Sequence, residues 1–447
     1  MPDNPTHIYF IGIGGIGMSA LARYYLQNNY HVAGYDKTQT PLTEKLEAEG
    51  ALITYVDQVS EIPKVFTKAA KTKVIYTPAI PQDSAILNYF NKGDFNFTKR
   101  ALALGNIAKN HKTLAVAGTH GKTTTSSLLA HLFRQAQIPS TAFLGGISAN
   151  YQTNFWSDNE DGILVAEADE YDRSFLQLTP DTAIITSMDA DHLDIYENGD
   201  SLKDTFLAFS KQVQNHLVTR ADLNLPGHTY AVNTPADYSA ENIHIKDHAY
   251  YFDLQLKETR ITNIRSGLPG IHNVENATAA AAVAHLHSLS AEDIKAGIES
   301  FKGVRRRFEY HINRADLVYI DDYAHHPKEI EALLNSVRDL YPENDITIIF
   351  QPHLFSRTRD FMDDFASSLS LADEIILLDI YPAREKPIAG ISSSALAQKI
   401  DAKKVHHLPR TEALEYLEEH KPKVTLTVGA GDIDQMINAV KITLLNG

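Results

Sequence analysis

Short apolar runs typical of buried strands alternate with runs of helical periodicity over most of this 447-residue chain. Such alternation predicts parallel sheets with helices on both faces, which is an α/β fold. The length exceeds what one ordinary hydrophobic core supports, and at roughly 150 residues per domain it predicts three units. We place these units at residues 1–105, 106–312 and 313–447. Short polar segments between residues 225 and 266 predict a small antiparallel excursion in the second unit.

The segment AVAGTHGKTTT, residues 115–125, joins a short apolar strand to a helix through a loop with two glycines. The loop therefore falls at a helix N-terminus, where unpaired amides and the helix dipole favour an anion. We predict that it binds the phosphates of a nucleoside triphosphate, and the alternative is a purely structural strand-to-helix turn. The predicted phosphate-binding residues are Gly118, Thr119, His120, Gly121, Lys122, Thr123 and Thr124.

Two side chains of this loop have specific expected roles. Lys122 would supply positive charge to the β and γ phosphates, and the hydroxyl of Thr123 would bind Mg²⁺. The spacing departs from the usual GxxxxGK[ST] pattern, because Gly118 precedes Gly121 by only three residues.

A second glycine-rich loop follows the first strand of the chain. Gly12, Gly14 and Gly17 form GxGxxG between a strand and a helix, and Asp36 ends the next strand. This order matches the dinucleotide-binding fingerprint, so a nicotinamide-dependent oxidoreductase is a serious alternative. The fingerprint detects a diphosphate at a helix N-terminus, and a UDP-sugar also carries a diphosphate.

Carboxylates crowd the end of another strand of the second unit, in AEADEYD. Glu167, Asp169, Glu170 and Asp172 suit a hard, oxygen-seeking ion such as Mg²⁺, and Glu167, which closes the strand, is the best single candidate. A solvated acidic loop is the alternative. The following strand, TAIITS, ends at Ser187 and leads to His192 among three aspartates; taken alone, that histidine indicates only a hydrogen-bonded surface or core residue.

Asparagines surround the start of an alanine-rich helix in GIHNVENATAA. Helix capping accounts for one asparagine, and the amides of Asn273 and Asn276 also suit the edge of an adenine, with His272 beside them. Arg307 ends a basic run at the boundary of the third unit, where arginines either form a solvated linker or stabilise a transferring phosphoryl group.

Polar groups also follow two strands of the third unit. DDYAHHP places Asp322, Tyr323 and His325 after one strand, and QPHLFSRT places His353 and Arg357 after the next. Neighbouring strand ends of this kind predict a ligand crevice. The spacing of the histidines has no zinc signature, so we interpret them as substrate-facing or structural.

Composition excludes several classes of function. The net charge of -15 argues against a general nucleic-acid or membrane-surface binder. The chain has no cysteine, which rules out disulfides and thiolate chemistry and fits a reducing compartment. We see no signal peptide and no stretch of about 18 apolar residues, so we expect a cytoplasmic enzyme without stable membrane association.

The order of the motifs is more specific than any single motif. IGIGGIGM, AGTHGKTTT, EADEYDRSFL, DADHLDIY, HNVENATAA, GVRRRFE, DDYAHHP and QPHLFSRTRD together resemble the Mur ligases of bacterial peptidoglycan synthesis. The resemblance covers all three units and includes the short phosphate loop, since that family uses GTxGK[ST]. It implies Rossmann-like first and third domains around a central ATP-binding domain.

The resemblance is strongest to family members that use ATP and Mg²⁺ to join L-alanine to the lactyl carboxylate of UDP-N-acetylmuramate. It implies that the carboxylate first takes the γ-phosphoryl group of ATP, and that the amine then displaces phosphate from the acyl phosphate. Phosphorylation makes physical sense, because a carboxylate is a poor electrophile at neutral pH.

The resemblance to the Mur ligases also implies a role for the residues of each motif. Thr123, Glu167 and His192 would hold the metal ion, and Arg307 matches the arginine at the domain junction. His272, Asn273 and Asn276 would contact adenine, and Asp322 would meet the ribose. Tyr323, His325, His353 and Arg357 would line the amino-acid and reaction site. The UDP-sugar would be bound by Gly12, Gly14, Gly15, Gly17, Asp36, Thr77, Ala79 and Ile80.

Three alternatives stay open at this point. A murein-recycling ligase would attach a tripeptide to the same nucleotide sugar, and it shares much of EADEYD and DDYAHHP. A nicotinamide-dependent oxidoreductase leaves the phosphate loop and Glu167 without a role. A non-catalytic nucleotide-sugar-binding regulator would predict a damaged loop, yet Lys122 is present. Oligomeric state cannot be inferred from the sequence.

Overall fold

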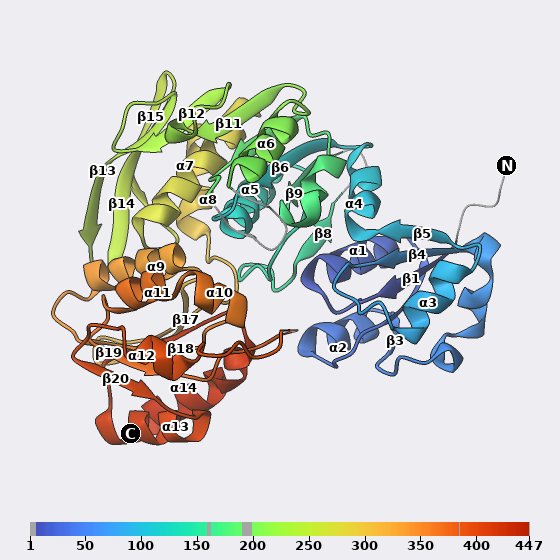
Figure 1. The fold of residues 1–447 in the computed structure, drawn as a ribbon. Helices are drawn as coiled ribbons and strands as arrows, with labels where there is room; N and C mark the ends of the chain where they lie inside the picture. Colours follow the sequence, from blue (N-terminus) through green and yellow to red (C-terminus); the bar gives the residue numbers. More distant parts are fainter. Residues whose placement is uncertain (1–5, 159–161, 190–198, 384, 447) are drawn as a thin grey trace. The chain divides into compact units, whose positions relative to one another are not determined.

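The computed structural model describes residues 6–158, 162–189, 199–383 and 385–446. Its strands form three sheets in chain order, of five, ten and six strands, with helices connecting most of the parallel strands (Figure 1). This arrangement confirms the predicted α/β fold. By contacts, the chain divides into two compact units: Met1–Ser239 with Gln255–Ile261 and Asn276–Ser300, and Ala240–Leu254 with Thr262–Glu275 and Phe301–Gly447.

The first sheet has the order β3-β2-β1-β4-β5, and all its neighbours are parallel. Because the order reverses at β1, the loops after β1, β2 and β4 meet at one edge, where doubly wound folds bind ligands. The elements are β1 (His7–Ile11), α1 (Ile16–Gln27), β2 (His31–Tyr35), α2 (Pro41–Ala48), β3 (Leu52–Thr54), β4 (Thr72–Tyr76), α3 (Ala85–Lys92), β5 (Asn96–Lys99) and α4 (Arg100–Ala108).

The second sheet has the order β15-β14-β13-β12-β11-β10-β6-β9-β7-β8. Parallel pairs of β6 with β9 and β10 form its centre, and β8 pairs antiparallel with β7 at one end. The elements are β6 (Lys112–Ala117), α5 (Lys122–Gln135), β7 (Ser140–Phe143), β8 (Phe155–Ser157), β9 (Ile163–Glu167), η4 (Tyr171–Gln177), β10 (Thr182–Ile185), α6 (Gly199–Ser210), β11 (His216–Arg220), β12 (His228–Val232), β13 (Tyr238–Lys246), β14 (Ala249–Leu256), β15 (Thr259–Arg265), α7 (Ile271–Leu286) and α8 (Ala291–Ser300).

The predicted antiparallel excursion is the run from β13 to β15. Only Asp247 and His248 connect β13 to β14, and both have positive φ, 50° and 54°. A two-residue turn with two positive φ angles is the hairpin turn whose twist suits antiparallel neighbours. One expected boundary was wrong: β10 ends at Ile185, not Ser187, and the side chains of Thr186 and Ser187, just beyond it, bond to the phosphate loop.

The third sheet has the order β16-β17-β21-β18-β19-β20, with β16 antiparallel and the others parallel. Its β16 begins at Glu309, just before the predicted start of the third unit. The elements are β16 (Glu309–Asn313), β17 (Val318–Asp322), α9 (Pro327–Leu340), β18 (Ile346–Phe350), α10 (Phe355–Asp360), α11 (Met362–Leu369), β19 (Glu374–Leu377), α12 (Ser393–Ala397), β20 (Lys404–His407), α13 (Arg410–His420), β21 (Val424–Val428) and α14 (Ile437–Asn446).

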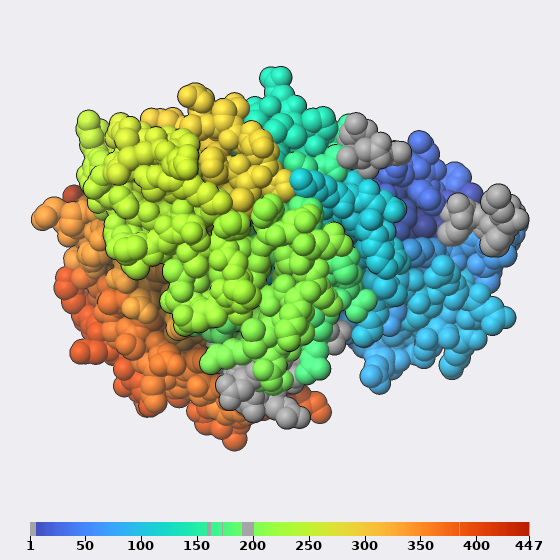
Figure 2. Space-filling view, turned by 90° about the horizontal axis from the view of Figure 1, so that it is seen from above, coloured from blue at the N-terminus to red at the C-terminus, as the bar shows by residue number. Residues whose placement is uncertain are grey.

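One hydrophobic core joins the first sheet to part of the second. It contains Phe10 and Leu21 together with Phe143, Phe155 and Leu164. In the space-filling view the blue N-terminal segment and the cyan-to-green segment of the same unit are in contact (Figure 2). Buried apolar side chains of these two sheets therefore pack against one another. Within the described residues, no helix is long and apolar enough to span a bilayer.

Candidate active site

The phosphate loop lies between β6 and α5, and α5 begins at Lys122 as the motif predicts. Gly118 and Gly121 have φ angles of 137° and 80°, which side-chain-bearing residues rarely adopt. A Cβ atom on Gly118 would lie 2.0 Å from Thr186 Oγ1, and one on Gly121 would lie 2.6 Å from Asn276 Oδ1. Both glycines are therefore required by the loop's own packing.

Lys122 is held by groups at the base of the loop. Its ammonium donates to the carbonyl of Gly118 at 2.6 Å and to Glu170 Oε1 at 2.9 Å, and Glu170 is fully buried. Burial lowers the pKa of Lys122, but the carboxylates of Glu170, Asp169 and Glu167 outweigh burial and leave the pKa above its ordinary value. Lys122 is therefore a charged group directed at the loop. The sequence predicts Glu170 as a member of the acidic cluster, but no local pattern indicates its pairing with Lys122.

The two predicted metal ligands that the structure describes lie side by side. Thr123 Oγ1 donates to Glu167 Oε2 at 2.9 Å. Glu167 also lies against the loop after β7, since a Cβ on Gly145 would be 1.9 Å from its Oε2. His192, the third predicted ligand, lies outside the described residues. Among the described residues, no group of three or more histidines or carboxylates is already arranged around an ion position.

Two side chains that follow β10 form hydrogen bonds with the phosphate loop. Ser187 Oγ accepts from the backbone amide of His120 at 2.8 Å and lies 2.9 Å from Thr119 Oγ1. Thr186 Oγ1 donates to the carbonyl of His120 at 2.5 Å. Thr124 is buried in the first turn of α5. The loop is thus held in shape by hydrogen bonds to Thr186 and Ser187, which follow β10.

The first glycine loop gathers the residues that were predicted to bind the UDP-sugar. Gly12 has a φ of 89°, and a Cβ there would lie 2.7 Å from Thr77 and 3.1 Å from Ile80. A Cβ on Gly17 would lie 2.4 Å from Arg100 Nη1. Gly15 caps the N-terminus of α1, and Ala79 lies in the loop after β4. Arg100 was not found by sequence analysis, because nothing around it forms a motif.

Asp36 ties two loops of the first sheet together. Its Oδ2 accepts from the backbone amide of Gly14 at 2.8 Å, and its Oδ1 accepts from that of Thr38 at 3.2 Å. A dinucleotide-binding acid would instead present its carboxylate to a ribose. The contacts of Asp36 in this protein are those of a loop brace.

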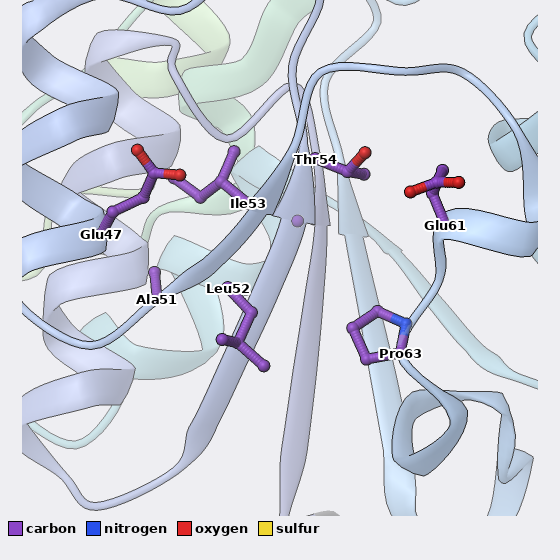
Figure 3. A pocket seen from close by; sticks show the side chains of 8 residues that line it. Glu47, Ala51, Leu52, Ile53, Thr54, Glu61 and Pro63 are labelled. Atoms are coloured by element: carbon purple, nitrogen blue, oxygen red, sulfur yellow. The ribbon is translucent and has the colours of Figure 1, made fainter.

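A separate cavity of about 330 Å³ lies at the β3 edge of the same sheet. In Figure 3 the carboxylates of Glu47 and Glu61 stand on opposite sides of it. It is lined by Gly34, Glu47, Ala51, Leu52, Ile53, Thr54, Glu61 and Pro63. None of the predicted nucleotide-binding residues lines this cavity, so it is not part of the candidate site.

In the second compact unit, Asp322 ends β17 and is held by the backbone around it. Its two oxygens accept from the amides of Phe308 and Ala324, both at 2.7 Å. Burial raises the pKa of Asp322 to about 6, while Arg307 and these amides oppose the rise. Asp322 thereby fixes the segment that carries the arginines.

The arginines of this segment surround Tyr323. The guanidinium carbons of Arg306 and Arg307 each lie 5.3 Å from its ring centroid. Arg306 donates to Asp321 at 3.0 Å, and Arg307 lies 3.9 Å from Glu329 Oε1. Arg306 therefore pairs with Asp321, and Arg307 lies beside Glu329.

The histidines predicted to face the substrate lie together. The ring centroids of His325 and His353 are 6.3 Å apart, and His353 stacks on Tyr381 at 5.7 Å. Arg357 Nη1 lies 3.4 Å from His353 Nδ1. Burial, with His325 and Arg357, lowers the pKa of His353 to about 4, and burial also lowers that of His325. Both imidazoles are neutral at pH 7.

The start of α7 carries the predicted adenine-binding residues. His272 has a pKa lowered to about 4 by burial and by Arg307, so it is a neutral imidazole. Asn273 donates to the carbonyl of Pro269 at 2.6 Å, which is a turn-stabilising contact. Asn276 Oδ1 accepts from Thr125 Oγ1 of the phosphate-loop helix at 3.1 Å. Asn276 therefore lies directly beside the phosphate loop.

These sites define a class of protein: an α/β protein with a glycine loop between a strand and a helix in each of two sheets. Comparisons agree. The Mur ligase family catalytic domain matches residues 7–112, the Mur ligase middle domain matches 116–284, and the Mur ligase glutamate ligase domain matches 306–431. The chain belongs to the Mur ligase family, whose members are ATP-dependent, ADP-forming ligases.

Individual relatives are similar over nearly the whole chain. A UDP-N-acetylmuramate–L-alanine ligase of Cytophaga hutchinsonii is 49% identical, covering 98% of this chain and 97% of the relative. One of Parabacteroides distasonis is 46% identical over 98% of this chain and 96% of the relative. A crystal structure of the UDP-N-acetylmuramate–alanine ligase of Thermotoga maritima has a TM-score of 0.83 at 28% identity, covering 98% of this chain and 99% of that chain.

Proposed function

We propose that this protein joins the amine of L-alanine to the lactyl carboxylate of UDP-N-acetylmuramate, with cleavage of ATP to ADP and phosphate, in the synthesis of peptidoglycan precursors. The full-length similarity to ligases of that name supports the assignment. The observation that carries it is the presence of two glycine loops on two sheets, each between a strand and the N-terminus of a helix, one after β6 with Lys122 and one after β1. A ligase that activates a nucleotide sugar with ATP needs both. The cysteine-free composition fits a reaction in the cytoplasm.

The two loops support different tasks. Gly12, Gly14, Gly15 and Gly17 would receive the diphosphate of UDP-N-acetylmuramate at the N-terminus of α1, with Thr77, Ala79 and Ile80 beside it. The amides after Gly118, with Lys122, would hold the β and γ phosphates of ATP. Asp36 would keep the first loop closed through its two backbone contacts.

The residues at the phosphate loop fit Mg²⁺. A hydroxyl and a carboxylate oxygen 2.9 Å apart, on Thr123 and Glu167, form a hard oxygen donor set beside the loop. We propose that these two residues and His192 hold the ion. When bound, Mg²⁺ would neutralise charge on the phosphate oxygens during transfer.

We propose that the lactyl carboxylate takes the γ-phosphoryl group with release of ADP. The neutral amine of alanine then attacks the acyl carbon and expels phosphate, and the nitrogen gives up one proton to the released phosphate or to solvent as the amide forms. Lys122 and Arg307 would offset negative charge on the phosphoryl group. His272, Asn273, Asn276 and Asp322 would contact the adenosine part of ATP.

Alanine would bind in the second compact unit. Arg357 would pair with its carboxylate, while Tyr323 and the imidazoles of His325 and His353 would line the pocket. His325 Nδ1 donates to the carbonyl of Tyr323 at 3.0 Å, so the Nε2 atom of this neutral imidazole can accept a hydrogen bond from the amino group of the substrate. His353 Nδ1 accepts from Arg357, so the neutral imidazole of His353 would donate to the substrate through its Nε2–H group.

A phosphate-release screen tests the assignment. Phosphate should appear only when UDP-N-acetylmuramate, L-alanine, ATP and Mg²⁺ are all present, and glycine and L-serine measure the selectivity of the pocket. Turnover with a murein tripeptide but not with alanine would show the murein-recycling reaction instead. Hydride transfer to a nicotinamide cofactor would show the oxidoreductase.

Isotope tracing tests whether the reaction passes through the proposed acyl phosphate. If an acyl phosphate forms, ¹⁸O placed in the lactyl carboxylate must appear in the released phosphate, because one carboxylate oxygen leaves with the phosphoryl group. Phosphate free of the label would exclude this intermediate.

A further inference from the structure

The loop between β7 and β8, residues 144–154, touches both proposed nucleotide sites of the first compact unit. At its start, Gly145 packs so closely against Glu167 that a Cβ atom would lie 1.9 Å from Oε2. At its end, Asn154 contacts the first turns of α1. The backbone amide of Leu144 donates to the carbonyl of Asn154 at 3.0 Å, so the two ends of the loop are joined. A short path therefore runs from the proposed metal ligand to the proposed diphosphate site.

Asn154 directs its whole side chain at α1. It is fully buried, and its amide nitrogen donates to the carbonyl of Ile16 at 2.6 Å and to Ser19 Oγ at 2.9 Å. Its amide oxygen accepts from the guanidinium of Arg23. Ser19 Oγ in turn donates to the carbonyl of Ile16 at 2.8 Å. These bonds fix the first turn of α1, whose N-terminal amides face the proposed diphosphate.

Packing alone does not account for this polar cluster. Phe143 and Phe155, which flank the loop, already pack against Tyr24 of α1 with ring centroids 5.8 and 6.2 Å away. Arg23, by contrast, is only 6% exposed and is paired with Glu49 at 2.7 Å. Buried polar groups cost desolvation, and they define one orientation where apolar contacts would tolerate sliding.

We propose that Asn154 is a positioning residue, which sets the register between the UDP-sugar helix α1 and the ATP-binding sheet so that the lactyl carboxylate meets the γ-phosphoryl group. This inference rests on the proposed function. Transfer between two bound nucleotides depends on their alignment, and an error of about 1 Å at a distance from the chemistry can reduce the rate about 100-fold. Asn154 itself touches neither nucleotide in this assignment.

The test separates alignment from binding. Asn154→Asp keeps the acceptor for Arg23 and loses both donors, and Asn154→Ala loses all three bonds. For both variants we expect kcat for phosphate release to fall about 10- to 100-fold, while the dissociation constants of UDP-N-acetylmuramate and of ATP, each titrated alone by calorimetry, change less than about threefold. Ser19→Ala is a smaller change to the same cluster and should lower kcat by a few fold. It replaces the Asn154 variants as the test if those variants do not fold.

Gln27→Ala is the matched control. Gln27 lies at the other end of α1 and donates to the carbonyl of Ser157 at 2.7 Å, so it crosses the same interface away from the diphosphate loop. It should keep kcat within about twofold of the unmodified protein. An unchanged kcat in Asn154→Asp and Ser19→Ala, or an equal loss in Gln27→Ala, would overturn this inference. Lack of turnover in the unmodified protein would instead overturn the proposed function itself.

Discussion

At the scale of single residues, Glu170 is the partner that the phosphate-loop lysine has before any ligand binds. Its carboxylate is fully buried and lies 2.9 Å from the ammonium of Lys122. Removing one member of a buried ion pair leaves an uncompensated charge, which costs about 3 to 5 kcal/mol. A bound triphosphate would supply a new counter-charge to Lys122. Under the proposed function, Glu170 would therefore stabilise the protein when no nucleotide is bound and would compete with the nucleotide for the ammonium of Lys122.

Glu170→Gln should consequently lower the melting temperature of the free protein and enlarge the stabilisation that ATP provides. The amide of the glutamine can still accept a hydrogen bond from Lys122, but it cannot neutralise the positive charge of the lysine ammonium. Thermal unfolding with and without ATP measures both effects, and Glu258→Gln, an exposed carboxylate in the turn after β14, is the control. An ATP-induced shift equal to or smaller than that of the unmodified protein would contradict the competition.

At the scale of elements, one histidine connects α5, the β7–β8 loop and α8. His131 is 2% exposed; its Nδ1 lies 2.7 Å from the hydroxyl of Tyr151 and its Nε2 lies 3.0 Å from Ser300 Oγ. Burial lowers its pKa to about 4. Between this value and about 6.5 the unfolded chain binds the proton more strongly than the folded protein. The stability that His131 contributes is therefore complete above about pH 6.5 and is lost as the pH falls towards 4.

We expect the free energy of unfolding to fall between pH 7 and pH 5, with about 2 kcal/mol of the loss due to His131. His131→Gln should be less stable at pH 7, but it should lose less on acidification. Urea unfolding at the two pH values measures the difference, and the exposed His244 provides a His244→Gln control. Parallel losses in the His131 variant and the unmodified protein would refute the role of this histidine.

At the scale of the whole molecule, the two proposed nucleotide sites belong to different sheets. Lys122 follows β6 of the second sheet, while Gly12 and Gly14 follow β1 of the first. Lys122→Ala should therefore abolish phosphate release and leave the affinity for UDP-N-acetylmuramate within about threefold of the unmodified protein. Calorimetric titration of the sugar nucleotide checks this. An equal loss of sugar binding would contradict the division of labour between the sheets.

The chain also divides into two compact units, and the proposed alanine-binding residues belong to the second. Ligases that bring three substrates together commonly close around them, which excludes water from the reacting groups. We expect ATP with UDP-N-acetylmuramate to decrease the radius of gyration in small-angle X-ray scattering. Unchanged dimensions with saturating ligands would rule out closure on binding.

Much of the fold and of the candidate site could be predicted from the sequence, because both depend on short contiguous patterns. A strand, two glycines and a helix are adjacent in residues 112–135, so periodicity and loop chemistry predicted the phosphate loop and the start of α5 at Lys122. The grouping of His325 and His353 was predicted for the same reason, since each lies in the loop that follows a strand. The hydrogen bond from Thr186 to the carbonyl of His120 in the phosphate loop was not predicted, because it is a tertiary contact.

The sequence by itself therefore determined the three-sheet α/β plan, both glycine loops and the order of the motifs that indicates a Mur ligase. Tertiary structure alone decided which side chains pair across long separations. Asn154 reaches Ile16 over 138 residues, Arg100 reaches Asp169 over 69, and Lys122 finds Glu170 over 48. Such pairs have no local signature, because burial and geometry in the folded structure, not spacing along the sequence, select the partner.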